Sequence, residues 1–291
     1  MAFHSSKVNP KRFEVSQLKF YAILVPVAFL MLLPIVYIVN QAFKPLDELF
    51  MFPPRFLVEN PTLKNFQDLF KTASETGVPM TRYLFNSIIV TVITVVLTIY
   101  ITATSAYALS KKNFKSKKFL LSVNETALMF VAIAVMIPRY LMIVQVNLSN
   151  NLLAHIVPAL AMPVGLFLVK QFIDQLPNEL IEAARLDGAS EFTIITQIVV
   201  PLIKPALATV GLLAFQSVWN ATESSNLYIT DETLKTFAFY MNTLTTQAAG
   251  NTTAGAGMSA AASLIMFLPN FIIFIFMQSR VMNTMSHSGI K

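Results

Sequence analysis

The segment ELIEAARLDGASEFTIITQIVVP, residues 179–201, places four acidic side chains and one arginine between two apolar runs of the chain. We expect Asn178 to cap a first short helix that has acidic residues near its positive end. Gly188 permits a turn with positive φ, and Ser190 can cap a second helix that leads to Pro201. A charged helical hairpin needs water or a partner around it, so its place in the fold depends on the rest of the chain.

The composition of the whole chain is that of a membrane protein. It has 291 residues, a mean hydropathy of +0.62 and only 12% charged residues, too few to cover a soluble domain of this length. Cysteine is absent, and His4, His155 and His287 are far apart in sequence, which gives little support to a metal or haem enzyme. Loop lysines explain the net charge of +6 better than nucleic-acid binding does.

Six windows are apolar and long enough to cross a bilayer, which takes about 20 residues of helix. They lie at residues 20–43, 83–110, 126–146, 152–169, 205–222 and 258–277. The first is too long for a cleaved signal peptide and has no small-residue cleavage site directly after it. The sequence therefore predicts an all-α membrane protein with six transmembrane helices.

Lysine and arginine are unevenly divided between the two sides of these windows. With the N-terminus inside, 14 of the 21 lie on the cytoplasmic side, five of them in KKNFKSKK at residues 111–118. The preference for positive charge in cytoplasmic loops predicts that both termini and residues 179–201 are cytoplasmic.

The third window contains two charges and a proline. Glu125 and Arg139 are separated by about 21 Å of helix, and a charge at the centre of the bilayer costs about 2.5–3.5 kcal/mol. We expect both side chains near opposite interfaces or facing a polar cavity, with Pro138 interrupting the helix.

A row of hydroxyl groups follows one face of the second window at intervals of three or four residues. Its members are Ser87, Thr91, Thr94, Thr98, Thr102 and Ser105. Such a face fits either one wall of a polar translocation path or a seam where membrane helices pack closely. The pattern favours the seam and leaves the path open.

Two long segments, residues 44–82 and 223–257, lie outside the membrane windows and contain proline- or glycine-marked turns. Solvated connectors explain most of their residues. Loops this long in a compact membrane protein are also suited to contact another protein, so we expect an extracytoplasmic partner there.

The quoted segment has a regular spacing: Glu-Ala-Ala, three residues, Gly, nine residues, Ile, two residues, Pro. In these residues the chain resembles the permease subunits of binding-protein-dependent ABC importers, and it is most similar to the second permease of maltose-type sugar importers. FNSIIVT and SAYALSKKNF within residues 85–114, NPTLKNFQDLF at 60–70 and FQSVWNAT at 215–222 extend the resemblance over nearly the whole chain. Val200 precedes Pro201 where the family often has leucine, and the final SRVMNTMSHSGIK resembles a branch that handles oligosaccharides from complex or acidic polysaccharides.

The resemblance implies the type I ABC importer permease fold in a bacterial cytoplasmic membrane, surrounded by lipid. Residues 1–19 and 282–291 are then cytoplasmic, 20–281 form the permease domain, and 174–203 form its coupling loop. The implied partners are a homologous second permease in a heterodimer, two cytoplasmic ATPase subunits that bind ATP and Mg, and an extracytoplasmic solute-binding lipoprotein. The chain lacks the phosphate-binding motif GxxxxGK[ST], so we expect a transport subunit with no cofactor, metal or catalytic residue of its own.

By resemblance, part of the loop docks on the ATPase. Its acidic residues supply charge, its alanines permit close approach, and its glycine sets the angle of the turn. The candidate coupling residues are Glu182, Ala183, Ala184, Asp187, Gly188, Ile198 and Pro201.

Candidate contacts with the solute are hydroxyl, amide and aromatic side chains, which can bind sugars in a pore. They are Asn86, Thr94, Thr98, Tyr140, Gln216, Trp219 and Asn220. Trp219 also fits an interfacial anchor, and the partner permease can hold most of the site. The expected solute is an oligosaccharide derived from a complex or acidic polysaccharide such as pectin or alginate. The alternatives are a permease for a non-sugar solute and, with little intramembrane charge to support it, an ion-coupled secondary transporter.

Overall fold

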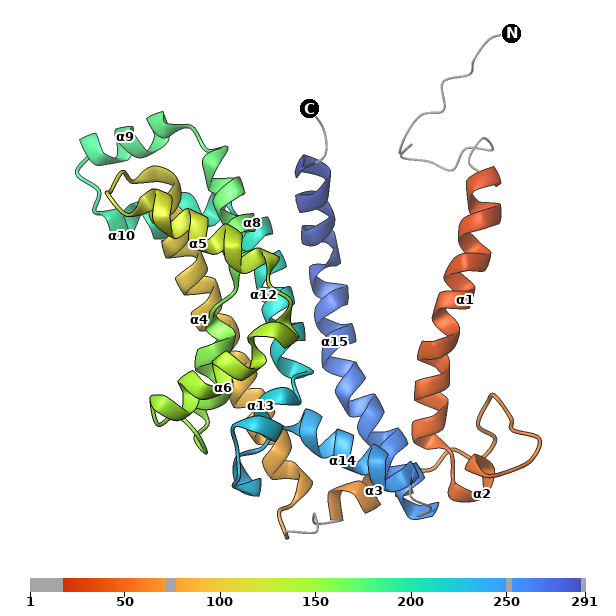
Figure 1. Ribbon diagram of the computed structural model, residues 1–291. Helices are drawn as coiled ribbons and strands as arrows, with labels where there is room; N and C mark the ends of the chain where they lie inside the picture. The colour runs from red at the N-terminus through yellow and green to blue at the C-terminus, as the bar shows by residue number, and fades with distance from the viewer. Residues whose placement is uncertain (1–17, 72–76, 250–252, 289–291) are drawn as a thin grey trace.

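The computed structural model describes residues 18–71, 77–249 and 253–288, and the regular elements within these ranges are helices (Figure 1). Three helices are long and apolar enough to cross a membrane alone, and three pairs of helices pass the same test when each bent pair is taken as one span. These six units correspond to the six predicted windows, so the all-α class is confirmed and the count of six spans agrees with the structure.

The three straight spans are α1, α4 and α15. Their bounds are Leu18–Phe43, Met80–Lys111 and Thr253–Ser288. Most side chains of α1 are exposed, and Ala42 is the buried residue of this helix, so its apolar surface faces lipid or another subunit. Figure 1 shows α1 packed on α15 near α2 and diverging from it toward the other end.

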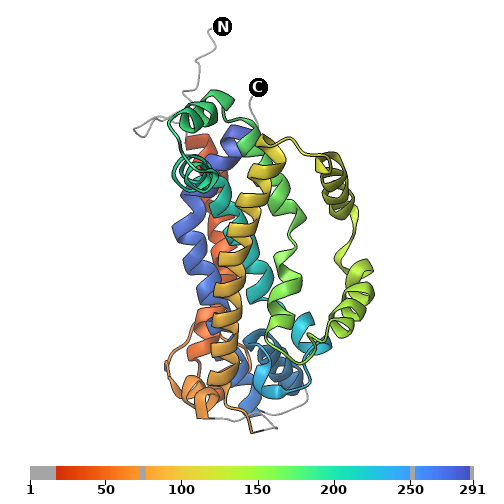
Figure 2. The ribbon, with the colours of Figure 1, turned by 90° about the vertical axis from the view of Figure 1, so that its left-hand side faces the viewer.

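The three bent spans supply the rest of the bundle. The first comprises α5 (Lys117–Met129), the 3₁₀ helix η2 (Ala132–Val135) and α6 (Met136–Gln145), bent by 114°. The second comprises α7 (Leu153–Ile156), η3 (Val157–Leu160) and α8 (Pro163–Asp174), bent by 44°. In the third, α12 (Lys204–Trp219) meets the segment before it at 85°. Figure 2 shows α5 and α6 along one side of the bundle.

The break in the third predicted window is not at Pro138. Helix α5 ends at Met129, and Phe130 and Val131 have extended backbone before η2 begins. Pro138 lies in the first turn of α6, where a missing N–H breaks no hydrogen bond within the helix, so proline is tolerated there.

Short helices cover the end of the bundle near α2. They are α2 (Leu46–Leu49), α3 (Lys64–Lys71), α13 (Glu223–Leu227), η5 (Glu232–Leu234) and α14 (Phe237–Ala249). Most of residues 223–249 are therefore not a solvated connector, because Phe237 and Tyr240 are buried with Tyr83 of α4 in a hydrophobic cluster. Residues 250–252 of that predicted segment lie outside the described residues.

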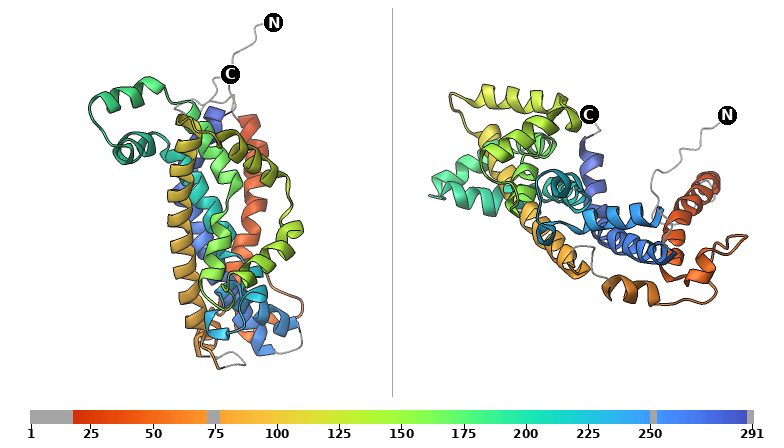
Figure 3. Two further views of the ribbon diagram at one scale, coloured as in Figure 1. Left: turned by 60° about the vertical axis from the view of Figure 1, so that its left-hand side comes forward. Right: turned by 60° about the horizontal axis from the view of Figure 1, so that its bottom comes forward.

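Four short helical pieces connect α8 with α12 at the opposite end. They are α9 (Asn178–Leu186), α10 (Glu191–Thr193), the π-helix η4 (Ile194–Val199) and α11 (Val200–Leu202). Figures 1 and 3 show them at the same end of the bundle as the start of α1 and the last turns of α15. The predicted hairpin thus lies at the same end of the bundle as both ends of the described chain, on the side away from α1 (Figure 1).

Candidate functional site

The hairpin of residues 174–203 is the most distinct candidate site. Helix α9 lies outside the bundle and α10, η4 and α11 return to it, so that the hairpin projects sideways from the end of the spans (Figure 3), with an 85° bend before α12. We call this segment the coupling hairpin.

The turn after α9 is closed by two backbone hydrogen bonds. Gly188 has φ of +80°, its N–H donates to the Arg185 carbonyl, and the Ala189 N–H donates to the Ala184 carbonyl, both at 3.0 Å. This pairing satisfies the last carbonyl groups of the helix and requires the left-handed conformation that glycine adopts readily. The prediction that Gly188 forms a positive-φ turn is confirmed.

The two predicted helix caps have different outcomes. Ser190 caps the second helix as predicted, since its Oγ accepts from the Thr193 N–H at 3.2 Å. Asn178 does not cap the first. The extended Pro177 takes the N-cap position, so Asn178 is already helical and its Oδ1 accepts from Lys111 Nζ at 2.9 Å.

Glu191 attaches the hairpin to the end of α4. Its carboxylate accepts hydrogen bonds from the Tyr107 hydroxyl at 2.8 Å and from Arg185 Nε at 3.1 Å, and it forms an ion pair with Lys112. The hydrogen bond from Lys112 is the largest of the contacts that hold the pKa of Glu191 below its usual value. One exposed carboxylate therefore joins both arms of the hairpin to a membrane-spanning helix.

Further bonds attach the other side of the hairpin to the same helix end. Lys111 Nζ donates to the Leu176 carbonyl at 2.6 Å, and the Ser110 hydroxyl donates to Asp174 Oδ1 at 2.6 Å. Asp174 also pairs with Lys170 at 2.7 Å. Displacement of the hairpin must therefore displace the end of α4 or break these bonds.

The inner face of the hairpin belongs to the core of the bundle. Ile181, Ala184, Ile194 and Val199 are buried in one cluster with residues of α4, α8 and α12. Of the predicted coupling residues, Ala184 therefore packs against its own chain, and Ile198 is half-buried against the same cluster. The inner face of the hairpin and the spans therefore share one packed core.

The outer face is exposed and mixes charge with large apolar side chains. Glu182, Ala183 and Asp187 lie on it, as predicted for a docking surface, and Gly188 and Pro201 are also exposed. Leu180, Leu186 and Phe192 are exposed by 46%, 89% and 64%. Exposed large apolar side chains beside carboxylates are typical of surfaces that contact another protein.

Sequence reasoning missed Glu191, Leu186 and Phe192 as contributors to this site. The exposure of Leu186 follows from its helical phase, because residues 181 and 184 face inward and 186 falls on the opposite side. The role of Glu191 could not be found in the same way, because its partners Tyr107 and Lys112 are about eighty residues away in sequence.

Two predicted solute contacts on α4 lie in a helix-packing seam. Thr94 and Thr98 are fully buried, and their hydroxyls, like that of Thr91, have no hydrogen-bond partner among the described residues. The packing seam therefore explains these positions better than a pathway wall. Asn86, also buried, attaches α4 to the segment around η5 by donating to the Thr233 and Lys235 carbonyls at 2.8 and 2.9 Å.

Three further predicted contacts lie at the end of α12. Trp219 is buried, stacks on Phe215 and donates to the Met266 carbonyl of α15 at 3.1 Å, so it is not an interfacial anchor. Gln216 and Asn220 are exposed, and the Asn220 amide oxygen accepts from Asn270 at 3.4 Å. These two amides are thus exposed one turn apart at the end of α12.

A polar cavity of about 390 Å³ lies in the half of the bundle away from the hairpin. It is bounded by residues of η2, α6, η3, α12 and α13, and Arg139 and Glu223 face it with a nitrogen-to-oxygen separation of 3.5 Å. Of the two alternatives predicted for Arg139, a place near an interface or one facing a polar cavity, the structure shows the second. Tyr140, another predicted solute contact, is partly exposed and stacks on Tyr228, which donates to Glu223 at 3.4 Å.

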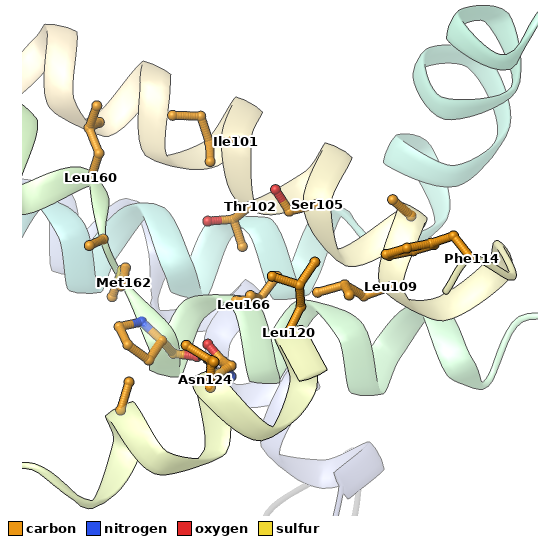
Figure 4. A pocket seen from close by; sticks show the side chains of 15 residues that line it. Ile101, Thr102, Ser105, Leu109, Phe114, Leu120, Asn124, Leu160, Met162 and Leu166 are labelled. Atoms are coloured by element: carbon orange, nitrogen blue, oxygen red, sulfur yellow. Dashed lines mark hydrogen bonds between the residues drawn. The ribbon is translucent and has the colours of Figure 1, made fainter. Parts of the chain in front are cut away.

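A second cavity, of about 470 Å³, lies between α4, α5 and α8 (Figure 4). Its walls are mostly apolar, with the hydroxyls of Thr102 and Ser105 and the amide of Asn124 as the polar groups labelled there. The far end of the hydroxyl row thus faces space beside the broken span. Within the described ranges, no three His, Asp or Glu side chains gather where a metal ion could bind.

Comparison with known proteins agrees with this architecture. Residues 100–279 match the family described as "Binding-protein-dependent transport system inner membrane component". The chain is 28% identical to the arabinooligosaccharides transport system permease protein AraQ of Halalkalibacterium halodurans, over 91% of this chain and 93% of that protein. It is 27% identical to the sulfoquinovosyl glycerol transport system permease protein SmoH of Agrobacterium fabrum, over 89% of each.

The fold is also similar to a solved structure. A chain of a bacterial ABC transporter involved in the import of the acidic polysaccharide alginate superimposes with a TM-score of 0.77 and 22% identity. The match covers 93% of this chain and 99% of the other. At this identity the likeness establishes the fold.

Proposed function

Because the chain belongs to the binding-protein-dependent transport system inner membrane components, we propose that it is a permease subunit of an ATP-driven importer of oligosaccharides. It lies in a bacterial cytoplasmic membrane beside a homologous second permease. Two ATPase subunits dock on its cytoplasmic end, and a solute-binding lipoprotein delivers the sugar to the opposite end.

The coupling hairpin is the observation that supports this proposal most directly. Its inner face is part of the bundle core, whereas its outer face exposes Leu186, Phe192 and two carboxylates to a partner. We infer that this face docks in a groove of an ATPase subunit that holds ATP and Mg. Closure of the ATPases then moves the hairpin, and its bonds to Ser110, Lys111 and Lys112 pass the movement to α4.

The distribution of charge and the shared position of the two chain ends support the orientation that we propose. Positive charge is concentrated at the end with the hairpin, and the start of α1 and the last turns of α15 lie there too (Figure 1). We therefore assign this end to the cytoplasm. The opposite end exposes Phe50, Phe52 and Leu57 in the segment that follows α2, a surface suited to a binding protein or to the second permease.

The solute class comes from the relatives. Two of them are permeases whose names specify arabinooligosaccharides and a sulfonated sugar glycoside, and the chain of similar fold comes from an alginate importer. We propose an oligosaccharide derived from a complex or acidic polysaccharide. Uptake by the complete importer of oligosaccharides, amino acids and osmolytes, supplied one at a time, tests the class. Failure of every oligosaccharide to compete would contradict it.

Two variants of the hairpin test the docking proposal: one reverses a charge on its exposed face and the other disrupts its turn. We expect Glu182→Arg and Gly188→Pro to abolish copurification of the ATPases and solute-stimulated ATP hydrolysis while the protein remains in the membrane. Lys115→Glu is the matched control, since it reverses an exposed charge outside the hairpin. Normal assembly and hydrolysis in both hairpin variants would contradict the proposal.

A further inference from the structure

The polar cavity around Arg139 contains a charged pair that the coupling mechanism does not use. Arg139 lies in the first turn of α6, which η2 separates from the break at Phe130 and Val131, and Glu223 is the first residue of α13. Of the residues that line the cavity, these two are the ones with full charges. A charged side chain in a membrane span is expensive unless it faces water or a partner, so such a residue indicates a functional site.

The pair is loosely held. The closest approach of Arg139 Nη1 to Glu223 Oε1 is 3.5 Å, and the two side chains are 36% and 39% exposed. The Tyr228 hydroxyl reaches the same carboxylate oxygen at 3.4 Å. By contrast, the ion pair between Lys170 and Asp174 has a separation of 2.7 Å. A long and hydrated ion pair exchanges its partner at little cost.

The other residues that line the cavity carry no full charge. His155 is buried, and its Nε2 lies 3.1 Å from the Leu234 carbonyl while its Nδ1 lies 2.7 Å from the Ser224 hydroxyl. Since a carbonyl only accepts, Nε2 donates the proton and Nδ1 accepts from serine. Both ring nitrogens are thereby occupied, which leaves Arg139 as the cation available to a ligand.

The carboxylate of Glu223, which lies beside Arg139, indicates the chemical class of that ligand. A guanidinium group presents a planar fork of donors that matches a carboxylate, and Glu223 already occupies that role loosely. The cavity volume of about 390 Å³ lies within the range of small-ligand sites. Hydroxyls of Ser217 and Thr222 at its wall can bind sugar hydroxyls.

We propose that this cavity is a solute subsite in which Arg139 binds the carboxylate of an acidic sugar unit, with Glu223 released as the solute enters. The proposal rests on the oligosaccharide importer function and specifies the charge of the sugar that the site selects. Glu223 holds Arg139 in place while the site is empty and competes with the solute for it.

The test uses the complete importer, with its second permease, ATPases and binding protein, in sealed vesicles. The probes are a galacturonate trisaccharide and its methyl ester, which is equal in length and uncharged. For Arg139→Gln we expect KM for the acid to rise at least tenfold and KM for the ester to change less than twofold. Each variant is compared with wild type on the same sugar, so the preference of the binding protein cancels.

Glu223→Gln is the second variant, because it keeps the side-chain shape and removes the competing charge. We expect it to lower KM for the acid at least threefold, whether or not Arg139→Gln assembles. An unchanged KM for the acid in Glu223→Gln, or an equal loss of both sugars in an assembled Arg139→Gln importer, would overturn the subsite. Uptake by wild type of the ester or of another neutral oligosaccharide, but not of the acid, would also overturn the subsite. Failure of wild type to take up any oligosaccharide, these two included, would contradict the importer function instead, which separates the two proposals.

Discussion

Gly188 adopts a conformation that other residues reach only at a cost. Its φ of +80° is in the left-handed region, and a Cβ at this position would meet no atom within 4 Å. The cost of a side chain here is therefore backbone strain alone, about 1–2 kcal/mol for an ordinary residue and less for asparagine. The turn, not local packing, determines the residue at this position.

We therefore predict a graded series at Gly188. Gly188→Ala should increase hydrogen exchange of the amides that close the turn, those of residues 188 and 189, by about 5- to 30-fold. Gly188→Asn should fall between alanine and wild type, because asparagine tolerates the left-handed region. Hydrogen exchange followed by mass spectrometry of the purified protein measures both. Equal protection in all three proteins would contradict the strain argument.

Glu191 is the residue at which both arms of the hairpin and α4 meet. Its folded pKa is depressed, chiefly by Lys112, so the stabilisation it gives is complete at neutral pH and is lost as the pH falls through that folded value. We predict that Glu191→Gln makes opening of the hairpin about two- to five-fold faster at low salt, with a smaller difference at high salt.

Hydrogen exchange of residues 187–193 at two ionic strengths checks this prediction. Glu182→Gln is the matched control. Glu182 is an exposed carboxylate of the same hairpin, and it forms no ion pair within the part of the chain that the structure describes. An effect of Glu191→Gln that is independent of salt, or an equal effect in the control, would show that the carboxylate does not act through its charge.

At the scale of elements, the helices follow from apolar length, but the breaks within them do not. Pro138 indicated a break because proline disrupts a helix interior, yet the chain bends at Phe130 and Val131, which have no such property. A run of apolar residues fits a straight helix and a bent one equally well. Phe130 and Val131 are exposed and neither α5 nor η2 has a buried residue, so packing within the described chain does not account for the position of the bend either.

A single sequence also does not show which element a helix face meets, and for this reason several candidate solute contacts proved to be packing residues. The spacing of hydroxyls showed that Thr94 and Thr98 share a face of α4 with Ser87, but spacing does not reveal what lies opposite. In the fold that face meets neighbouring helices, and Trp219 meets α15. The coupling hairpin was more predictable because its turn and second cap are local features, which a short stretch of sequence defines.

Substitution of the buried hydroxyls of α4 tests whether they lie in a packing seam or on the solute pathway. Thr94→Val and Thr98→Val replace a hydroxyl that has no partner among the described residues by a methyl group of similar size. We expect the free energy of unfolding to be unchanged or to rise by up to about 1 kcal/mol, with solute uptake unchanged. Thermal unfolding in detergent and uptake in vesicles measure the two effects.

Ser87→Ala is the contrasting variant on the same face. The Ser87 hydroxyl accepts from the Phe237 N–H at 2.8 Å, so its removal leaves a buried donor unpaired at a cost of about 1–3 kcal/mol. A loss of uptake in stable Thr94→Val or Thr98→Val proteins would instead place these hydroxyls on the solute path.

At the scale of the whole molecule, the six spans separate two ends with different chemistry. One end holds the coupling hairpin and most of the positive charge, and the other holds the short helices α2, α3, α13 and α14 (Figures 1 and 3). The cavity around Arg139 lies in the half near this second end, so a solute delivered there would reach Arg139 before it approached the hairpin.

The absence of cysteine from the sequence allows this orientation to be tested without background labelling. We predict that Phe52→Cys reacts with a membrane-impermeant maleimide only from outside the cell membrane, and Leu186→Cys only in inside-out vesicles. Both side chains are highly exposed, at 93% and 89%, so access decides the reaction. Thr98→Cys, at a fully buried position, is the control that should react from neither side. Bound ATPase should protect Leu186→Cys and leave Phe52→Cys reactive, whereas labelling of both from one side would contradict the orientation.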